Sequence, residues 1–425
     1  MSPRPKRRSA ASPPVEYSLL LTATMCLLAF GVVMVFSASS TTSLLSSSGD
    51  SAYYLKRTAL FGIVGLLVMR VLAIRGVQVI RALTPAILVV SFAACVLVLM
   101  PGFGVEVNGA KRWIGAGILQ IQPSEVLKVA LILYGANLLA SRRKMVSGGI
   151  GPMVPFLGAI AAACVLVVVE PDLGTAMVVC FTAAALLLTA GARPRDIGLL
   201  ALGLGVMIAL AIMIEPYRMQ RLTGFLDPSA DPTGSGFQVI QAKIAIGSGG
   251  MFGAGLGEGI QKAFYLPEAH TDMIAAVIGE ELGFVGIAGL VGLYGLFGYA
   301  GLQIARRARD RYGKLLATGL TSMVLIQAVI NLCAVLGLAP LTGVPLPFVS
   351  YGNSSMLVML AAVGLLLNIA RGGSARSAKR PSSAAAVEAP GGRLRVVDGA
   401  NGRHSRGGNG GARRTGPRRR RRAAR

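Results

Sequence analysis

Long apolar stretches recur along this chain and constrain its fold more than any other feature of the sequence. Each holds roughly 18 residues or more, which is enough for a helix to cross a hydrocarbon core of roughly 30 Å. The stretches lack the alternation of apolar and polar residues that membrane β-strands require. The sequence therefore predicts an all-α polytopic membrane protein with about ten transmembrane helices. The expected spans are residues 17–37, 57–74, 83–100, 124–140, 153–170, 173–190, 197–214, 273–300, 316–338 and 353–370.

The composition agrees with a membrane fold and indicates no metal site. Of the 425 residues, 53% are hydrophobic and 14% are charged, whereas soluble domains carry roughly 25% charged residues. The five cysteines all stand inside apolar stretches, and the chain has two histidines and no CxxC or HExxH pattern. We expect the cysteines to pack as small core residues and no side chains to ligate a metal. The sequence requires no cofactor, although a divalent cation is compatible with it.

Basic residues predict how the chain is oriented across the membrane. Four short connections hold twelve Lys and Arg residues: the one with Arg75 and Arg81, and residues 141–144, 192–196 and 306–314. Short cytoplasmic loops carry an excess of Lys and Arg, so these connections and both termini are expected in the cytoplasm. The chain is thus expected to be a multi-pass protein of the cytoplasmic membrane.

The two ends of the chain differ from its apolar body. We expect a basic cytoplasmic N-terminal segment (1–16), a membrane domain (17–370) and a disordered basic cytoplasmic tail (371–425). The tail holds sixteen Lys and Arg and no apolar periodicity, which is typical of disorder. An electrostatic tether to anionic lipids is its simplest role, and a docking segment for a cytoplasmic protein is the alternative. Nucleic acid is not an expected partner.

Polar and turn-forming clusters gather on the side of the membrane that is expected to face outward. They are residues 108–128, 170–176, 215–272 and 340–355. The third is a loop of about 58 residues between the seventh and eighth spans, far longer than an ordinary connection. Because functional residues tend to lie on loops that a rigid scaffold positions, we expect an outward-facing site.

Basic residues in these clusters suit an anionic ligand. The candidates are Lys111, Arg112, Arg218, Arg221, Lys243 and Lys262, with Trp113 beside the first two at the headgroup level. Snorkelling of long side chains to the interface is the alternative. The stretch 245–259 is rich in glycine, so its backbone amides can hold a pyrophosphate; a tight or re-entrant turn is the alternative there.

Charged residues also enter two of the expected spans. Glu125 and Lys128 stand three residues apart on one helix face, where an ion pair would lower the cost of placing both near lipid. Glu280 and Glu281 lie about two turns inside the eighth span and are expected to pair with partners within the bundle. We expect both sets to be structural.

Asp272 stands where the long loop enters the eighth span, beside Glu268 and His270. A transferase that uses a pyrophosphate-linked sugar has a good leaving group and needs only one base for the acceptor hydroxyl. Asp272 can be that base, with Glu268 and His270 as candidate substrate-binding residues. The alternative is that Asp272 caps the helix.

Seven motifs in order resemble the SEDS family of FtsW, RodA and SpoVE, and the likeness runs from about residue 33 to residue 371. They are "NGAKRW", "QPSEVLK", "EPDLGTA", "GSGGMFGAGLG", "LPEAHTD", "GEELG" and "LPFVSYGNSS". The resemblance implies a ten-span peptidoglycan glycosyltransferase that polymerises lipid II outside the membrane. Asp272 matches the catalytic carboxylate of the family, with undecaprenyl pyrophosphate as the leaving group. The last motif adds Ser350 and Ser354 to the candidate substrate-binding residues.

The resemblance also implies partners. A class B penicillin-binding protein would cross-link the strands, and other division proteins would meet the cytoplasmic tails. The motifs look more like the division-type FtsW subgroup, which implies a place at the division septum. Met273 and Asn353 depart from the family pattern, but neither departure changes a charged residue of the motifs. An elongation-type RodA polymerase, a lipid II flippase or transporter, and a division scaffold are the alternative functions.

Overall fold

The computed structural model describes residues 14–45, 50–107, 110–116, 119–142, 151–263 and 265–373. The basic segment 1–16 is described only from residue 14, and the expected tail only to residue 373. Both segments, and the domain boundaries drawn from them, therefore remain predictions.

Helices dominate the described residues, and this confirms the predicted fold class. Eight of the helices described are long and apolar enough to cross a membrane, and α5 is a shorter apolar helix. The nine are α1 (Val15–Leu45), α2 (Tyr53–Leu99), α3 (Pro123–Ser141), α5 (Val154–Val169), α6 (Leu173–Ala190), α7 (Pro194–Ile214), α10 (Ile274–Arg307), α11 (Arg311–Val335) and α12 (Asn353–Ala370). Two expected spans, 57–74 and 83–100, lie in the single helix α2, so the count of ten remains a prediction.

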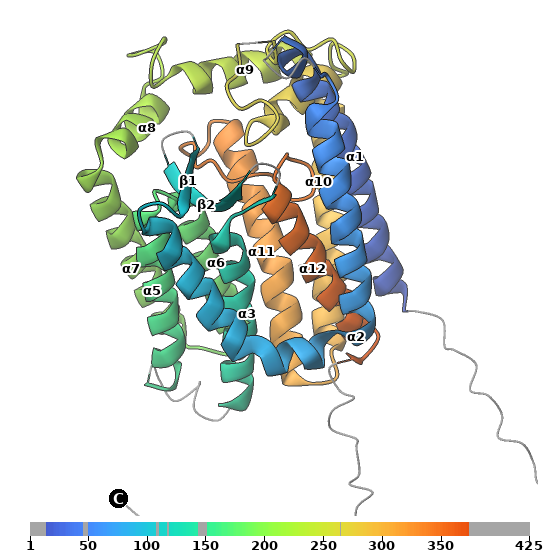
Figure 1. Cartoon of the computed structure of the whole chain (residues 1–425), viewed down its shortest axis with the longest axis vertical. Helices are drawn as coiled ribbons and strands as arrows, with labels where there is room; N and C mark the ends of the chain where they lie inside the picture. The colour runs from blue at the N-terminus through green and yellow to red at the C-terminus, as the bar shows by residue number, and fades with distance from the viewer. Residues whose placement is uncertain are drawn as a thin grey trace, which may run out of the picture. The chain divides into compact units, whose positions relative to one another are not determined.

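Helix α2 is broken at Gly76, where the backbone leaves helical geometry with φ 1° and ψ −112°. In Figure 1, α2 descends beside α1, turns at the lower edge and rises toward β1. The side chain of Asn368 in α12 fills the break. Its Nδ2 donates to the carbonyl of Ala73 at 3.0 Å, and its Oδ1 accepts from the amide of Val77 at 3.3 Å. The short connection that the sequence predicted here is therefore a bend within one helix.

A three-stranded antiparallel sheet lies between α2 and α3, where the sequence predicted no strand. It consists of β1 (Gly104–Val107), β2 (Ala110–Ala116) and β3 (Leu119–Ile121), paired in that order. Strands of 4, 7 and 3 residues are too short to produce a clear alternating pattern. We call the end of the bundle that carries this sheet the sheet end (upper half of Figure 1).

The long segment 215–272 also has more structure than a loop. It contains α8 (Pro216–Leu226) and α9 (Phe237–Gly249), followed by turns up to the start of α10. Both helices lie at the sheet end in Figure 1. Helix α11 packs against α3, α6, α10 and α12, and its contact face is buried, as Leu316, Leu320 and Val324 illustrate. This central helix supports the segments that cross the sheet end.

Candidate functional site

Asp272 lies at the sheet end, directly before α10. The residue that caps α10 is Met273, and no side chain makes a capping hydrogen bond to this helix. The Asp272 carboxylate instead accepts a hydrogen bond at 3.2 Å from the hydroxyl of Thr271, its neighbour in the chain. The structure therefore disfavours the capping alternative, because the carboxylate does not bind the amides of the helix start.

One side chain of α11 holds the backbone of Asp272 in place. Asn331 is buried, and its Nδ2 donates to the carbonyl of Asp272 and to the carbonyl of Val344, both at 2.8 Å. Gly343, with φ 70°, faces the carboxylate: a Cβ built on it would lie 3.9 Å from Asp272 Oδ2. The candidate base thus lies under the segment that joins α11 to α12.

The surroundings of Asp272 raise the pKa of its carboxyl to about 6. Burial is the largest cause, because a half-buried carboxylate loses hydration. The negative charge of Glu268 acts in the same direction, and the guanidinium of Arg221 opposes both. Asp272 is therefore mostly ionised at pH 7 and still basic enough to accept a proton, as general base catalysis requires.

His270 packs in an aromatic cluster instead of standing free. Its ring centroid lies 4.3 Å from that of Tyr54 in α2 and 5.6 Å from that of Tyr351. The amide of Tyr351 donates to the carbonyl of His270 at 2.9 Å. Burial lowers the pKa of His270, against the opposing charge of Glu268. A neutral, packed His270 fixes the segment before Asp272 against α2.

Arg112 and Arg218 each donate to two backbone carbonyls. Arg112 donates to the carbonyls of Glu170, at 3.0 Å, and Pro171, which form the turn between α5 and α6. Arg218 donates to the carbonyl of Val168 at 2.7 Å. Arg112 thus stabilises the turn between α5 and α6, and Arg218 joins the ends of α5 and α7, so some of the N–H donors of both guanidinium groups are already used within the fold.

Arg221 and Lys243 remain better placed for an anion. Arg221 donates to the carbonyl of Leu341 at 3.1 Å and is the basic residue whose charge acts on Asp272. Lys243, in α9, is exposed, and its side chain runs past Gly337, because a Cβ there would lie 2.7 Å from Lys243 Cε. Both residues therefore border the segment that covers Asp272.

Lys111 and Trp113 lie on β2. Lys111 is exposed, pairs across the sheet with Glu106, and lines an open cavity of about 250 Å³ with Leu99, Glu106, Val169 and Pro171. Trp113 is half-buried opposite Val105. Of the two, Lys111 is the one that faces open space.

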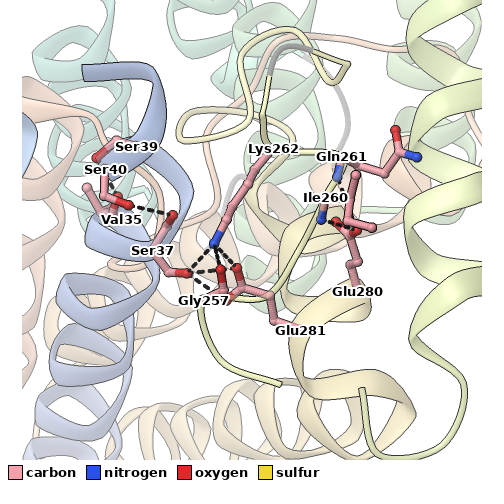
Figure 2. A network of polar contacts seen from close by, with 10 residues as sticks. All are labelled: Val35, Ser37, Ser39, Ser40, Gly257, Ile260, Gln261, Lys262, Glu280 and Glu281. Atoms are coloured by element: carbon pink, nitrogen blue, oxygen red, sulfur yellow. Dashed lines mark hydrogen bonds and ion pairs between the residues drawn. The ribbon is translucent and has the colours of Figure 1, made fainter. Parts of the chain in front are cut away.

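Lys262 is not the outward cation that the sequence suggested. Its side chain is 4% exposed, and its Nζ lies 2.6 Å from Glu281 Oε1. The ammonium also donates to the carbonyl of Gly257 at 2.7 Å and to the hydroxyl of Ser37 at 3.1 Å (Figure 2). The charge is compensated within the fold, because a buried cation is stable only when paired. Glu281 thus has a partner from the loop.

The serines of the last motif make structural hydrogen bonds. Ser350 Oγ accepts from the amide of Leu346 at 2.8 Å. Ser354 Oγ accepts from the amide of Gln122 at 3.0 Å and donates to the carbonyl of Gln120 at 3.2 Å. The second set fastens β3 to the start of α12.

Glu125 and Lys128 form a buried ion pair in α3, with Nζ and Oε1 2.8 Å apart and both side chains 2% exposed. Lys128 also donates to Gln327 Oε1 at 2.8 Å, and Gln327 Nε2 donates to the carbonyl of Pro345 at 2.9 Å. The pair is therefore linked through α11 to the segment over Asp272.

The glycine-rich stretch uses its amides within the fold. Helix α10 breaks at Gly283, with φ 64° and ψ −159°, a conformation that is nearly restricted to glycine. The loop lies against this break. Four backbone hydrogen bonds join them, from Ala254 to Glu280, Gly255 to Glu281, Phe284 to Gly250, and Val285 to Met251. These bonds favour the tight-turn interpretation of residues 245–259 over a pyrophosphate cradle.

Sequence reasoning missed Asn331, Gln327 and the partners of His270. Gln327 and Asn331 stand four positions apart inside the expected span 316–338, and polar residues at such a spacing in a membrane helix could have indicated a buried polar role for both. The pairing of Tyr54 with His270 leaves no signal, since it joins residues more than 200 positions apart. Within the described residues, no group of three or more His, Cys, Asp and Glu side chains is arranged to hold a metal ion.

These observations define a class: a multi-pass membrane protein with one half-buried aspartate under a loop at one end of its helix bundle. The family model for FtsW, RodA and SpoVE, described as "Cell cycle protein", matches residues 17–374. The chain therefore belongs to the FtsW/RodA/SpoVE family, as its motifs suggested.

Individual relatives agree with this assignment. Stage V sporulation protein E of Bacillus subtilis is 42% identical over 354 residues, which cover 83% of this chain and 96% of that protein. A protein of Trichlorobacter lovleyi named probable peptidoglycan glycosyltransferase FtsW is 42% identical over 367 residues, covering 84% and 94%.

Solved structures share the fold. A chain from a peptidoglycan synthase complex, described as coordinating polymerization and crosslinking, is similar with a TM-score of 0.68 and 31% identity. The rod shape determining protein RodA of Thermus thermophilus is similar with a TM-score of 0.62 and 28% identity. Each match covers 85% of this chain and 98% of the other. The protein is therefore a polytopic membrane protein with the architecture of its family.

Proposed function

We propose that this protein is a peptidoglycan glycosyltransferase that polymerises lipid II on the outer face of the cytoplasmic membrane during cell division. The observation that carries the proposal is the Asp272 carboxylate, which caps no helix, is half-buried, and has a pKa raised to about 6. The names of the FtsW relatives support the same activity.

In the proposed reaction, Asp272 removes the proton from the acceptor hydroxyl while that oxygen attacks the anomeric carbon of the donor sugar. The bond to undecaprenyl pyrophosphate breaks with inversion, so one base suffices and no covalent intermediate forms. Arg221, Lys243 and Lys111 are the proposed contacts to the anionic substrate, since their positions at the sheet end leave them nearest to open space or to Asp272. A divalent cation on the pyrophosphate is compatible with this scheme.

The proposed orientation places the sheet end outside the cell and both termini in the cytoplasm. A class B penicillin-binding protein is the proposed partner, and the neighbour from a peptidoglycan synthase complex supports it. The division septum is the proposed location. The tails are proposed to contact anionic lipids and other division proteins.

The test is lipid II polymerisation by the purified protein with its cognate penicillin-binding protein, whose cross-linking site is blocked. Asp272→Asn is compared with the parent and with Asp50→Asn, which changes an exposed carboxylate paired with Lys56, after all three are matched for thermal stability and complex formation. We expect glycan chains from the parent and from Asp50→Asn, and none from Asp272→Asn.

Two results would contradict the proposal in different ways. Equal polymerisation by Asp272→Asn would mean that another group is the base. If no variant makes polymer while a reference polymerase does, transport or scaffolding becomes the better function.

A further inference from the structure

A buried polar network joins the loop before α10 to Glu280 and Glu281 of α10 and to Ser37 of α1 (Figure 2). At its centre, Lys262 donates to Glu281, Ser37 and the carbonyl of Gly257. Ser37 Oγ lies 2.7 Å from both carboxylate oxygens of Glu281. All three donors of the ammonium group are therefore used, and the network joins the loop, α10 and α1.

The neighbouring Glu280 strengthens the same junction. Its Oε1 accepts from the amides of Ile260, at 2.7 Å, and Gln261, at 3.1 Å. The backbone just before Lys262 is thus held by α10 as well. Loop and helix are joined by the side chains of Glu280 and Glu281 just before the Gly283 break, and by the backbone bonds described above on both sides of it.

The position of the pair in the sequence gives it a specific consequence. Lys262 and Glu281 are 19 residues apart, and Asp272 lies close to the middle of the stretch between them. The pair closes this stretch at its base, while Asn331 fixes its centre through the Asp272 carbonyl. Loss of the pair removes the side-chain bonds of Lys262 at this base and leaves only the Glu280 bonds and the backbone bonds to hold it.

Energetics favour a role beyond stability. Taking two charges out of water costs several kcal/mol per ion, so a buried ion pair is often no more stabilising than well-packed apolar side chains. Lys262 and Glu281 are 4% and 0% exposed. What apolar residues cannot replace is the direction of the bonds to Ser37 and Gly257.

We infer that Lys262 and Glu281, anchored by Ser37, are positioning residues that hold the Asp272 carboxylate in line with the acceptor hydroxyl. The inference rests on the proposed function of Asp272 as the base. It predicts that geometry, not only folding, is lost when the pair is removed.

The test separates these two effects with an apolar double variant, Lys262→Met/Glu281→Leu, in the full chain with its partner. Each single variant leaves one buried charge unpaired and lowers the melting temperature. The double variant restores the melting temperature to near that of the parent. Its kcat for lipid II polymerisation is expected to remain at least tenfold below the parent, with KM within twofold. A purely structural pair would regain kcat together with stability.

Two further readouts address positioning directly. A looser stretch admits water to Asp272, so the acid midpoint of the pH–rate profile should fall from about 6 toward the ordinary carboxyl range in the double variant. Ser37→Ala removes one anchor without leaving a charge unpaired, and it is expected to lower kcat about threefold at unchanged KM. This variant keeps the test decisive if the double variant does not fold.

Controls distinguish failure of this inference from failure of the proposed function. Lys56→Met removes an ion pair at the surface, in which the side chain of Lys56 is 69% exposed and that of Asp50 is 40% exposed. This variant should leave kcat and the melting temperature unchanged. Parent-like kcat and pH midpoint in the double variant, and in Ser37→Ala, would overturn the inference while Asp272→Asn remains inactive. An active Asp272→Asn would overturn the proposed function, and with it the inference.

Discussion

Glycine breaks two helices of this protein, and the two breaks are stabilised in different ways. At Gly76 in α2, one side chain, Asn368, bonds the backbone on both sides. At Gly283 in α10, the backbone of residues 250–255 supplies the bonds. At Gly76, where the chain only bends, the bonds of a single side chain are sufficient to satisfy the backbone. The break at Gly283 carries a whole loop, in the helix that begins directly after Asp272, so the geometry of the site is proposed to depend on how that loop is held.

The largest expected effect is at Gly283. In Gly283→Ala the new Cβ would meet the amide nitrogen of Gly253, and the backbone would remain at φ 64°. Strain and clash together are expected to lower the free energy of unfolding by about 4 kcal/mol. The measurement is thermal unfolding in detergent, with Gly292→Ala as the control, because a Cβ at Gly292 meets nothing within 4 Å. Equal melting temperatures would mean that the loop adapts to the break.

Asn368→Leu tests the other break. The substitution leaves the carbonyl of Ala73 and the amide of Val77 without their buried partner, at an expected cost of about 2–3 kcal/mol of unfolding free energy. The kcat of the folded fraction should stay at the parent value, because Gly76 lies at the opposite end from the site. Asn137→Leu, which loses an exposed bond from Arg81, should cost less than about 1 kcal/mol. A fall in kcat would show that the two breaks are coupled.

Acid should lower the activity by protonating Asp272, which precedes the helix that Gly283 breaks. Asp272 acts as a base in its ionised form, and its pKa is about 6. Polymerisation should therefore fall as the pH drops below 6, roughly tenfold at pH 5 relative to its plateau. The control is Glu170→Gln, because burial raises the pKa of Glu170 to about 7. If this variant loses the midpoint near 6, Glu170 and not Asp272 is the titrating group.

The smallest effect concerns the start of α2. Asp50→Asn removes the exposed ion pair with Lys56, and exposed pairs contribute little. The free energy of unfolding should therefore be unchanged within the error of the measurement, which is made beside Asn368→Leu in the same detergent. A larger loss of unfolding free energy would indicate that the stability of α2 depends more on its first turn than on the break at Gly76.

The sequence was sufficient for the fold class because apolar periodicity is local. Each expected span coincides with a helix to within a few residues at its ends. The bend at Gly76 was nevertheless predicted as a loop, because Arg75 and Arg81 are typical of a cytoplasmic connection. The short strands β1 to β3 were missed for a similar reason, because seven residues or fewer give too little pattern to recognise.

The site was predictable only where its residues cluster in the chain. Asp272, Glu268 and His270 stand within five positions and were found together. Lys262 looked like an outward cation, because the sequence does not reveal that Glu281 bonds to it. Asn331 remained hidden in an apolar span, since its two carbonyl partners are chosen by tertiary structure and not by spacing.

The bond partners of Asn368 also set an order of events during synthesis. Asn368 is 295 residues from Ala73, so the bend in α2 stays unsatisfied until almost all of the described chain has been made. The loop that contacts the Gly283 break is different. Its residues 250–255 are close in the chain to their partners at 280–285, so the loop can dock as soon as α10 inserts. Contacts between distant segments form late and leave intermediates exposed. A nascent chain that ends before α12 should therefore be a substrate for membrane quality control, even though every earlier helix is already in place.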